Sequence, residues 1–181
     1  DCDNVRDLKL RLTRALAAGR RFIEDADPAR GSSIVYDVAA QTLALNRELL
    51  FEADIEGAVE RLDNARQILT FGSGGGSSVM CQELQFRLMR LGYAVSAYPH
   101  GLLPRMVAAT PEPEDVVVVL SVSGYTPEMV ESAQIASQYG AQVIAITAVG
   151  SPLAAAANVV LPIAARETDF ILHPSASRYA L

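Results

Sequence analysis

Four consecutive valines, Val116 to Val119, set the fold class of this chain because they leave no polar face. A strand with one side in water alternates polar and apolar residues, whereas a parallel strand buried on both faces is apolar throughout. Parallel neighbours cannot be joined by tight turns and need crossovers, which are usually helices. The valine run therefore predicts a buried parallel sheet with helices between its strands.

Short apolar runs alternate with helical patterns throughout the chain after Arg66. The predicted strands are residues 67–71, 94–98, 115–120, 142–147 and 159–162. The predicted helices between them are residues 77–91, 102–109 and 126–139. We therefore expect an α/β domain with a five-stranded, parallel, doubly wound sheet of the flavodoxin-like order 2-1-3-4-5, flanked by helices.

Helical patterns also precede the sheet. A first helix carries apolar residues at helical spacing over residues 5–16 and ends near Gly19. Residues 25–33 combine Asp, Pro and Gly and indicate a linker. A second helix is predicted over residues 34–51, and a third begins after Asp54, a good N-cap. The apolar stripes of the first two helices need a partner, which favours a homodimer or a higher homo-oligomer.

Neither end of the chain reads as a natural boundary. The sequence begins within a helical pattern without Met, and it stops at Leu181 where another helix is starting. We expect a segment of a longer protein. Residues 1–25 would then be the remnant of a preceding domain with its linker, and residues 26–181 would form one domain.

The charge balance argues against nucleic-acid binding by this segment alone. Lys and Arg number 15 against 21 Asp and Glu, for a net charge of −6, whereas a free-standing nucleic-acid binder normally shows a basic face. The two cysteines, Cys2 and Cys81, form neither a disulfide framework nor a metal-ligand pattern. The sequence shows no 18-residue apolar run and no signal peptide. We expect a cytoplasmic protein without membrane contact, metal or cofactor.

A glycine-rich loop, Gly72 to Ser78, connects the first predicted strand to its helix. Glycines let a backbone turn sharply and approach a ligand closely, and the free N–H groups of the following helix suit an anion. Ser73, Gly74 and Ser77 are the candidate contacts in this loop. A plain tight turn would use the same glycines, so the loop alone does not decide between binding and structure.

A dinucleotide is the rival ligand for this loop, because Gly72-x-Gly74 resembles part of a nucleotide-binding fingerprint. That fingerprint expects an acidic residue at the end of the second strand to bind the ribose. Here the second strand runs into Tyr98-Pro99-His100, which holds no carboxylate. The sequence therefore disfavours a nucleotide-binding module without excluding it.

A second loop, Ser121 to Thr126, follows the third predicted strand and places three hydroxyls within six residues. Thr126 stands at the N-cap position of the next helix and is sufficient to cap it. Ser121 and Ser123 exceed that structural need, which favours a ligand. Gly124 allows an unusual backbone turn between them.

The predicted strand order brings the two loops together. Strands one and three are neighbours in a 2-1-3-4-5 sheet, and ligands bind in the crevice outside their carboxyl ends. Ser73 or Ser77 from one loop would then face the three hydroxyls of the other. With backbone amides they would form a cradle for a phosphate, and the chain shows no Walker lysine and no metal-ligand cluster.

These segments resemble the SIS (sugar isomerase) domain in order and spacing over about residues 34–181. The resemblance is carried by Phe71-Gly72-Ser73-Gly74, Ser121-Val122-Ser123-Gly124-Tyr125-Thr126, Val143 to Thr147, and Gly150-Ser151-Pro152-Leu153-Ala154. In that family the hydroxyls of the Ser-x-Ser-Gly-x-Thr turn hold the phosphate of a sugar phosphate. The resemblance thus implies phosphate contacts for Ser121, Ser123 and Thr126. Three consecutive glycines replace the family's more usual Gly-x-Gly-Ala-Ser in the first loop.

The N-terminal residues narrow the resemblance. Residues 5–12 are similar to the last helix of the helix-turn-helix domain in RpiR-type bacterial transcription regulators, and the segment from Glu167 to Arg178 resembles their HexR-like members. The resemblance implies an effector domain that binds a sugar phosphate or a phosphorylated sugar acid. DNA binding would then belong to the domain that precedes this segment.

An isomerase is the alternative within the same family. Moving a proton between adjacent carbons needs an acid and a base, and His100 with Glu167 is the candidate pair. A plain loop histidine, or one that only contacts a ligand, is the favoured interpretation of His100. Ser177 and Arg178 are further candidates for the pocket lining. Arg178 suits a ligand carboxylate, but an ion pair with a neighbouring acidic residue is the favoured interpretation.

Overall fold

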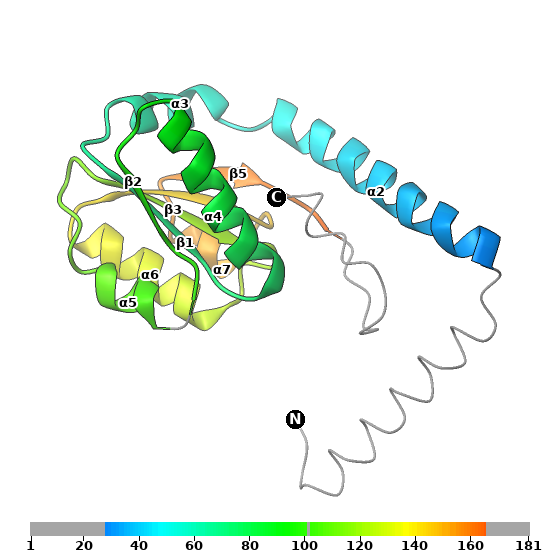
Figure 1. The fold of residues 1–181 in the computed structure, drawn as a ribbon. Helices are drawn as coiled ribbons and strands as arrows, with labels where there is room; N and C mark the ends of the chain where they lie inside the picture. The colour runs from blue at the N-terminus through cyan, green and yellow to red at the C-terminus, as the bar shows by residue number, and fades with distance from the viewer. Residues whose placement is uncertain (1–27, 101, 166–181) are drawn as a thin grey trace, which may run out of the picture.

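A five-stranded parallel sheet forms the centre of the protein (Figure 1), whose computed structural model describes residues 28–100 and 102–165. The strands are β1 (Ile68–Gly72), β2 (Val95–Tyr98), β3 (Val116–Ser121), β4 (Gln142–Thr147) and β5 (Val159–Pro162). Their order is β2-β1-β3-β4-β5, and every neighbouring pair is parallel. Both the strand positions and the predicted order are confirmed.

Helices cover both faces of this sheet (Figure 1). They are α2 (Pro28–Phe51), α3 (Ile55–Asp63), α4 (Gly75–Arg90), α5 (Leu103–Val107), α6 (Pro127–Gln138) and α7 (Pro152–Ala155). The valine run shows why both faces need cover. Val117 and Val119 pack on the side of α6 and α7, while Val116 and Val118 pack on the side of α3 and α4. All four are buried, as the unbroken apolar run predicts.

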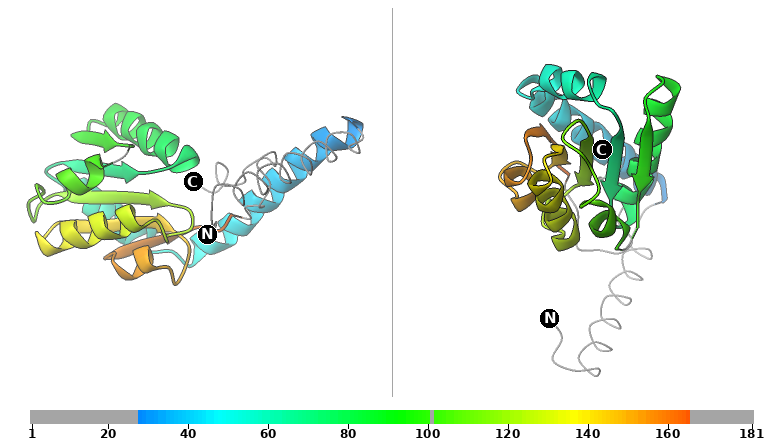
Figure 2. Two further views of the ribbon diagram at one scale, coloured as in Figure 1. Left: turned by 90° about the horizontal axis from the view of Figure 1, so that it is seen from below. Right: turned by 90° about the vertical axis from the view of Figure 1, so that its left-hand side faces the viewer.

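The predicted linker over residues 25–33 is wrong where the structure describes it. Residues 28–33 belong to α2, which begins at Pro28 and is 24 residues long. Proline is tolerated in the first turn of a helix because the N–H it lacks has no partner there. Gly31 inside the helix costs only about 1 kcal/mol relative to Ala. Figure 2 shows α2 projecting well beyond the sheet and its covering helices.

Asn46 fastens α2 to the outer edge of the sheet. Its Nδ2 donates a hydrogen bond to the Ala164 carbonyl at 2.7 Å, and the Ala164 N–H donates to Asn46 Oδ1 at 2.8 Å. Ala164 follows β5, so the two contacts join segments 118 residues apart. The side chain is buried, and both of its polar atoms are satisfied.

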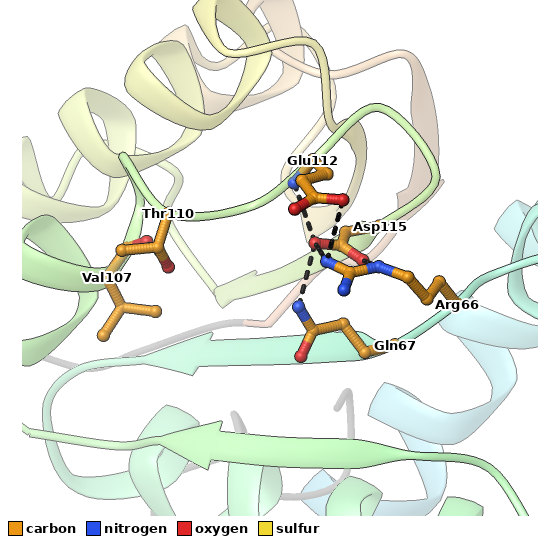
Figure 3. A network of polar contacts seen from close by, with 6 residues as sticks. All are labelled: Arg66, Gln67, Val107, Thr110, Glu112 and Asp115. Atoms are coloured by element: carbon orange, nitrogen blue, oxygen red, sulfur yellow. Dashed lines mark hydrogen bonds and ion pairs between the residues drawn. The ribbon is translucent and has the colours of Figure 1, made fainter.

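A polar network fixes the amino ends of β1 and β3 (Figure 3). Asp115 is fully buried and receives Arg66 Nε on Oδ1 at 3.0 Å and Arg66 Nη2 on Oδ2 at 2.8 Å. Gln67 Nε2 and the Glu112 N–H also donate to Oδ2, at 2.9 and 2.8 Å. Burial raises the pKa of Asp115, but these donors and the Arg66 charge outweigh it and hold the pKa below its ordinary value.

The structure adds two negative observations for residues 28–100 and 102–165. No helix there is long and apolar enough to cross a membrane. No group of three or more His, Cys, Asp and Glu side chains there is arranged to hold a metal ion.

Candidate phosphate-binding site

The two predicted loops begin at neighbouring positions on the carboxyl edge of the sheet. Gly72, the last residue of β1, is paired with Leu120 of β3. Ser121 ends β3 and is paired with Thr147 of β4. The glycine loop and the hydroxyl-rich turn therefore leave the sheet side by side, as the predicted strand order requires.

Gly72 brings the backbone of α4 against β1. A Cβ at Gly72 would lie 2.5 Å from the Ser77 carbonyl oxygen and 2.9 Å from Cys81 Cβ, so no larger residue fits. Gly74 is the N-cap of α4, with φ of 86°, and it has no side chain to occupy the free N–H groups of the first turn. The predicted start of this helix at residue 77 is two residues late, because Gly75 and Gly76 are already helical.

The serines of the first loop divide into two roles. Ser78 Oγ donates to the Pro99 carbonyl at 2.6 Å, which ties the end of β2 to the start of α4. Ser77 is also buried and Ser73 is half-buried, and neither hydroxyl is hydrogen-bonded to the part of the chain that the structure describes. Ser73, Gly74 and Ser77 remain predicted phosphate contacts.

The second loop is folded by its own hydroxyls. Ser121 Oγ accepts a hydrogen bond from the Gly124 N–H at 3.2 Å, and Ser123 Oγ accepts one from the Tyr125 N–H at 3.3 Å. Each serine acts as an acceptor in these bonds and keeps its own O–H as a donor. Gly124 has φ of 71°, a conformation that favours glycine.

Thr126 differs from expectation in one respect. It holds the N-cap position of α6 as predicted, but its side chain makes no capping hydrogen bond. Its carbonyl instead accepts from the Met129 and Val130 N–H groups at 3.0 and 3.1 Å. Its Oγ1 lies 3.4 Å from Ser121 Oγ. The hydroxyl expected to cap the helix thus faces the same turn as the serines.

The electrostatics of the two loops come from dipoles. Residues 72–78 and 121–126 contain no charged side chain. The free N–H groups at the start of α4 and the Glu128 N–H at the start of α6 carry partial positive charge, and hydroxyls can turn their protons toward an anion. This donor set suits a phosphate and offers no acid–base pair of its own.

His100 lies beside the first loop. It follows Pro99, whose carbonyl is bound by Ser78 at the start of α4, and its side chain is exposed. Glu167, Ser177 and Arg178 fall outside the described residues. The pairing of His100 with Glu167, and the pocket roles of Ser177 and Arg178, therefore stay predictions.

Cys81 is a buried residue on the helix that follows the glycine loop. It is fully buried on α4, and its Sγ lies 3.1 Å from the Thr70 carbonyl oxygen. Burial raises the pKa of its thiol. The side chain packs between α4 and β1 beneath the glycine loop and takes no part in the loop surface.

Two buried hydroxyls beneath the second loop were not predicted to have a role. Thr147 Oγ1 donates to the Ser121 carbonyl at 2.7 Å, and Ser151 caps α7 by accepting from the Ala154 N–H at 3.2 Å. The four-residue α7 was not predicted either, because one helical turn is too short to show a periodicity. The Ser-Pro pair that begins it is the signal that was available.

Comparisons with known proteins agree with this architecture. The sequence matches the SIS domain family over residues 61–181. It is 37% identical over 177 residues to the HTH-type transcriptional regulator HexR of Pseudomonas aeruginosa, a match that covers 95% of this chain and 62% of that protein. The chain thus spans less than two thirds of the length of this relative.

Solved structures show the same fold. The Vibrio vulnificus NanR protein complexed with ManNAc-6P has a TM-score of 0.71 at 24% identity, over 91% of this chain and 61% of that chain. The sugar isomerase domain of an RpiR transcription factor from Sphaerobacter thermophilus has a TM-score of 0.69 at 24% identity, over 81% and 83% of the two chains. With the family match covering all five strands and both loops, this chain belongs to the SIS domain family.

Proposed function

We propose that this chain is the effector-binding domain of an RpiR-type, HexR-like transcription regulator of carbohydrate metabolism, and that it senses a sugar phosphate or a phosphorylated sugar acid. One observation carries the proposal: three hydroxyls, from Ser121, Ser123 and Thr126, gather on a turn next to the glycine loop at the carboxyl edge of β1 and β3. Similarity to HexR supports a regulator. The ManNAc-6P complex of NanR supports a phosphorylated sugar as the class of ligand.

Regulation requires coupling between two sites. Ligand bound at the carboxyl edge would alter the arrangement of the two subunits of a homodimer, and so the spacing of DNA-binding domains that precede this segment. The side of α2 with Tyr36, Leu43 and Leu50 is proposed as part of the subunit contact. These three residues recur every seven positions and are 76, 56 and 45% exposed in the single chain.

Binding to a panel of phosphate esters tests the ligand class. We expect 6-phosphogluconate, glucose 6-phosphate or ManNAc-6P to raise the melting temperature, since a ligand that binds only the folded state stabilises it. Ser121→Ala and Ser123→Ala should abolish the shift. Ser137→Ala, an exposed serine at the other end of α6, is the matched control and should leave the shift intact. Absence of any shift across the panel would refute the proposal.

An isomerase remains the competing function, because His100 lies beside the glycine loop. A coupled aldose–ketose assay with the same esters separates the two. We expect no turnover. Turnover that disappears in His100→Ala or Glu167→Gln would replace the regulator with an enzyme.

A further inference from the structure

Two hydroxyl side chains, Thr147 and Ser151, form a buried floor under the hydroxyl-rich turn. Thr147 is the last residue of β4 and Ser151 is the N-cap of α7. Thr147 is fully buried and Ser151 is 2% exposed. Ser121 is buried as well, but the Thr147 hydroxyl donates to the Ser121 carbonyl and Ser151 Oγ accepts from the Ala154 N–H. We therefore expect any effect of Thr147 and Ser151 on binding to act through the turn.

The floor holds the turn at two backbone carbonyls. Thr147 Oγ1 donates its only proton to the Ser121 carbonyl at 2.7 Å. Three residues further along, the Gly124 carbonyl accepts from the Leu153 N–H at 3.2 Å. Leu153 lies in the first turn of α7, whose start is capped by Ser151. Both ends of the Ser121–Gly124 turn are therefore anchored to the segment from β4 to α7.

The turn also rests directly on this floor. A Cβ at Gly124 would lie 2.2 Å from Ser151 Oγ and 2.5 Å from Thr147 Oγ1. These two hydroxyls lie 3.4 Å from each other, and the Gly124 backbone packs closely against both. In this arrangement the Gly124 N–H lies 3.2 Å from Ser121 Oγ.

We propose that Thr147 and Ser151 are positioning residues of the phosphate site: they hold the turn in the geometry that brings the hydroxyls of Ser121, Ser123 and Thr126 together. The proposal rests on the proposed function, since it concerns the same site. The proposed effect of Thr147 and Ser151 on affinity is pre-organisation of the turn. A turn already in its binding geometry loses less conformational freedom when the ligand arrives.

The Thr147→Val substitution separates the hydrogen bond of Thr147 from its contribution to packing. Valine has nearly the shape of threonine but cannot donate to the Ser121 carbonyl. We expect Thr147→Val to weaken binding of 6-phosphogluconate, measured calorimetrically, by about 10-fold or more, and Thr147→Ser, which restores the hydroxyl, to recover most of it. Ser151→Ala should weaken binding in the same direction. If Thr147→Val does not fold, the affinity of Ser151→Ala alone tests the positioning role.

Thr70→Val is the matched control. Thr70 is fully buried in β1, and its hydroxyl donates to a backbone carbonyl, that of Cys81, at 3.2 Å. The same substitution there should lower the free energy of unfolding comparably and leave the affinity unchanged. The Gly124 amide resonance should shift in Thr147→Val and stay in place in Thr70→Val.

Two outcomes contradict the proposal, and they differ. If the natural sequence binds 6-phosphogluconate and folded Thr147→Val or Ser151→Ala binds it equally well, the positioning role is refuted while the proposed function stands. If the natural sequence binds no phosphate ester, the proposed function fails and the positioning role fails with it.

Discussion

The hydroxyl of Thr126 lies 3.4 Å from the hydroxyl of Ser121, across the turn that joins β3 to α6. A threonine at an N-cap usually turns its hydroxyl toward the N–H groups of its own helix. Here that side chain makes no such bond. Pro127 has no N–H and the Met129 N–H donates to the Thr126 carbonyl, so the first turn of α6 offers the Glu128 N–H beside the hydroxyls of the turn. This combination makes the turn suitable for an anion.

Thr126→Val is expected to weaken phosphate binding without destabilising α6. No capping bond is lost, so the free energy of unfolding should stay within about 0.5 kcal/mol of the natural value. Asp54→Ala should behave in the opposite way, because Asp54 Oδ1 accepts from the Gly57 N–H at 2.9 Å and losing such a cap costs about 1 kcal/mol. Urea unfolding and calorimetric titration with 6-phosphogluconate measure both quantities. A loss above about 1 kcal/mol in Thr126→Val would show that its hydroxyl does cap the helix.

Gly124→Ala should cost more stability than alanine at another glycine with positive φ. Gly92 has φ of 94° and open space where a Cβ would lie, so Gly92→Ala carries only the backbone penalty of about 1–2 kcal/mol. Gly124→Ala adds the clash with Ser151 and Thr147 to that penalty. Unfolding measured by urea should rank the two variants in this order, and only Gly124→Ala should lose phosphate binding. Equal free energies of unfolding for the two variants would mean that Thr147 and Ser151 move to accommodate the new methyl group.

Asp115→Asn should destabilise the fold by about 2–4 kcal/mol at pH 7. Both carboxylate oxygens accept hydrogen bonds, so an amide nitrogen in either place meets a donor. Glu112→Gln is the matched control on the same arginine. Glu112 is 3.6 Å from Arg66 Nη2 and its side chain is 61% exposed, and exposed pairs contribute about 0–1 kcal/mol.

The free energy of unfolding should vary with pH in a way that depends on Asp115. Its pKa is lowered in the folded protein, while in the unfolded chain it is about 3.9. The charged carboxylate therefore stabilises the fold fully above about pH 5, and this contribution is lost as the pH falls through 3.9 toward the folded pKa. Unfolding free energies measured between pH 7 and pH 3 should fall less steeply for Asp115→Asn than for the natural sequence. Parallel curves would exclude Asp115 as the group responsible.

Leu43→Glu is expected to weaken the proposed dimer. In a symmetric contact each substitution acts twice, and removing two buried leucines costs at least about 3 kcal/mol, or on the order of 100-fold in the dissociation constant. Leu91→Glu is the control, since Leu91 is 74% exposed at the end of α4. Light scattering across a concentration series reports both. A dimer unchanged by Leu43→Glu would place the contact on another surface.

The strands were predictable because a strand buried on both faces is an uninterrupted run of apolar residues, as in Val116 to Val119. The start of α2 was not predictable, because Pro28 and Gly31 are residue types more common in loops than in helices. The direction of the Thr126 side chain and the roles of Thr147 and Ser151 depend on contacts across the sheet. Thr147 reaches Ser121 only because β4 lies next to β3, a relationship that no local pattern encodes.

The Asn46 side chain gives Ala164 one acceptor and one donor, the pair of groups that an adjacent strand would offer. An uncovered outer strand is a template on which another chain can add, and proteins protect such edges. Here the position just past β5 is already occupied, and Pro162 within β5 has no N–H to present. The helix α2, whose exposed leucines we propose as part of a subunit contact, therefore also blocks the addition of another strand to the sheet at this point.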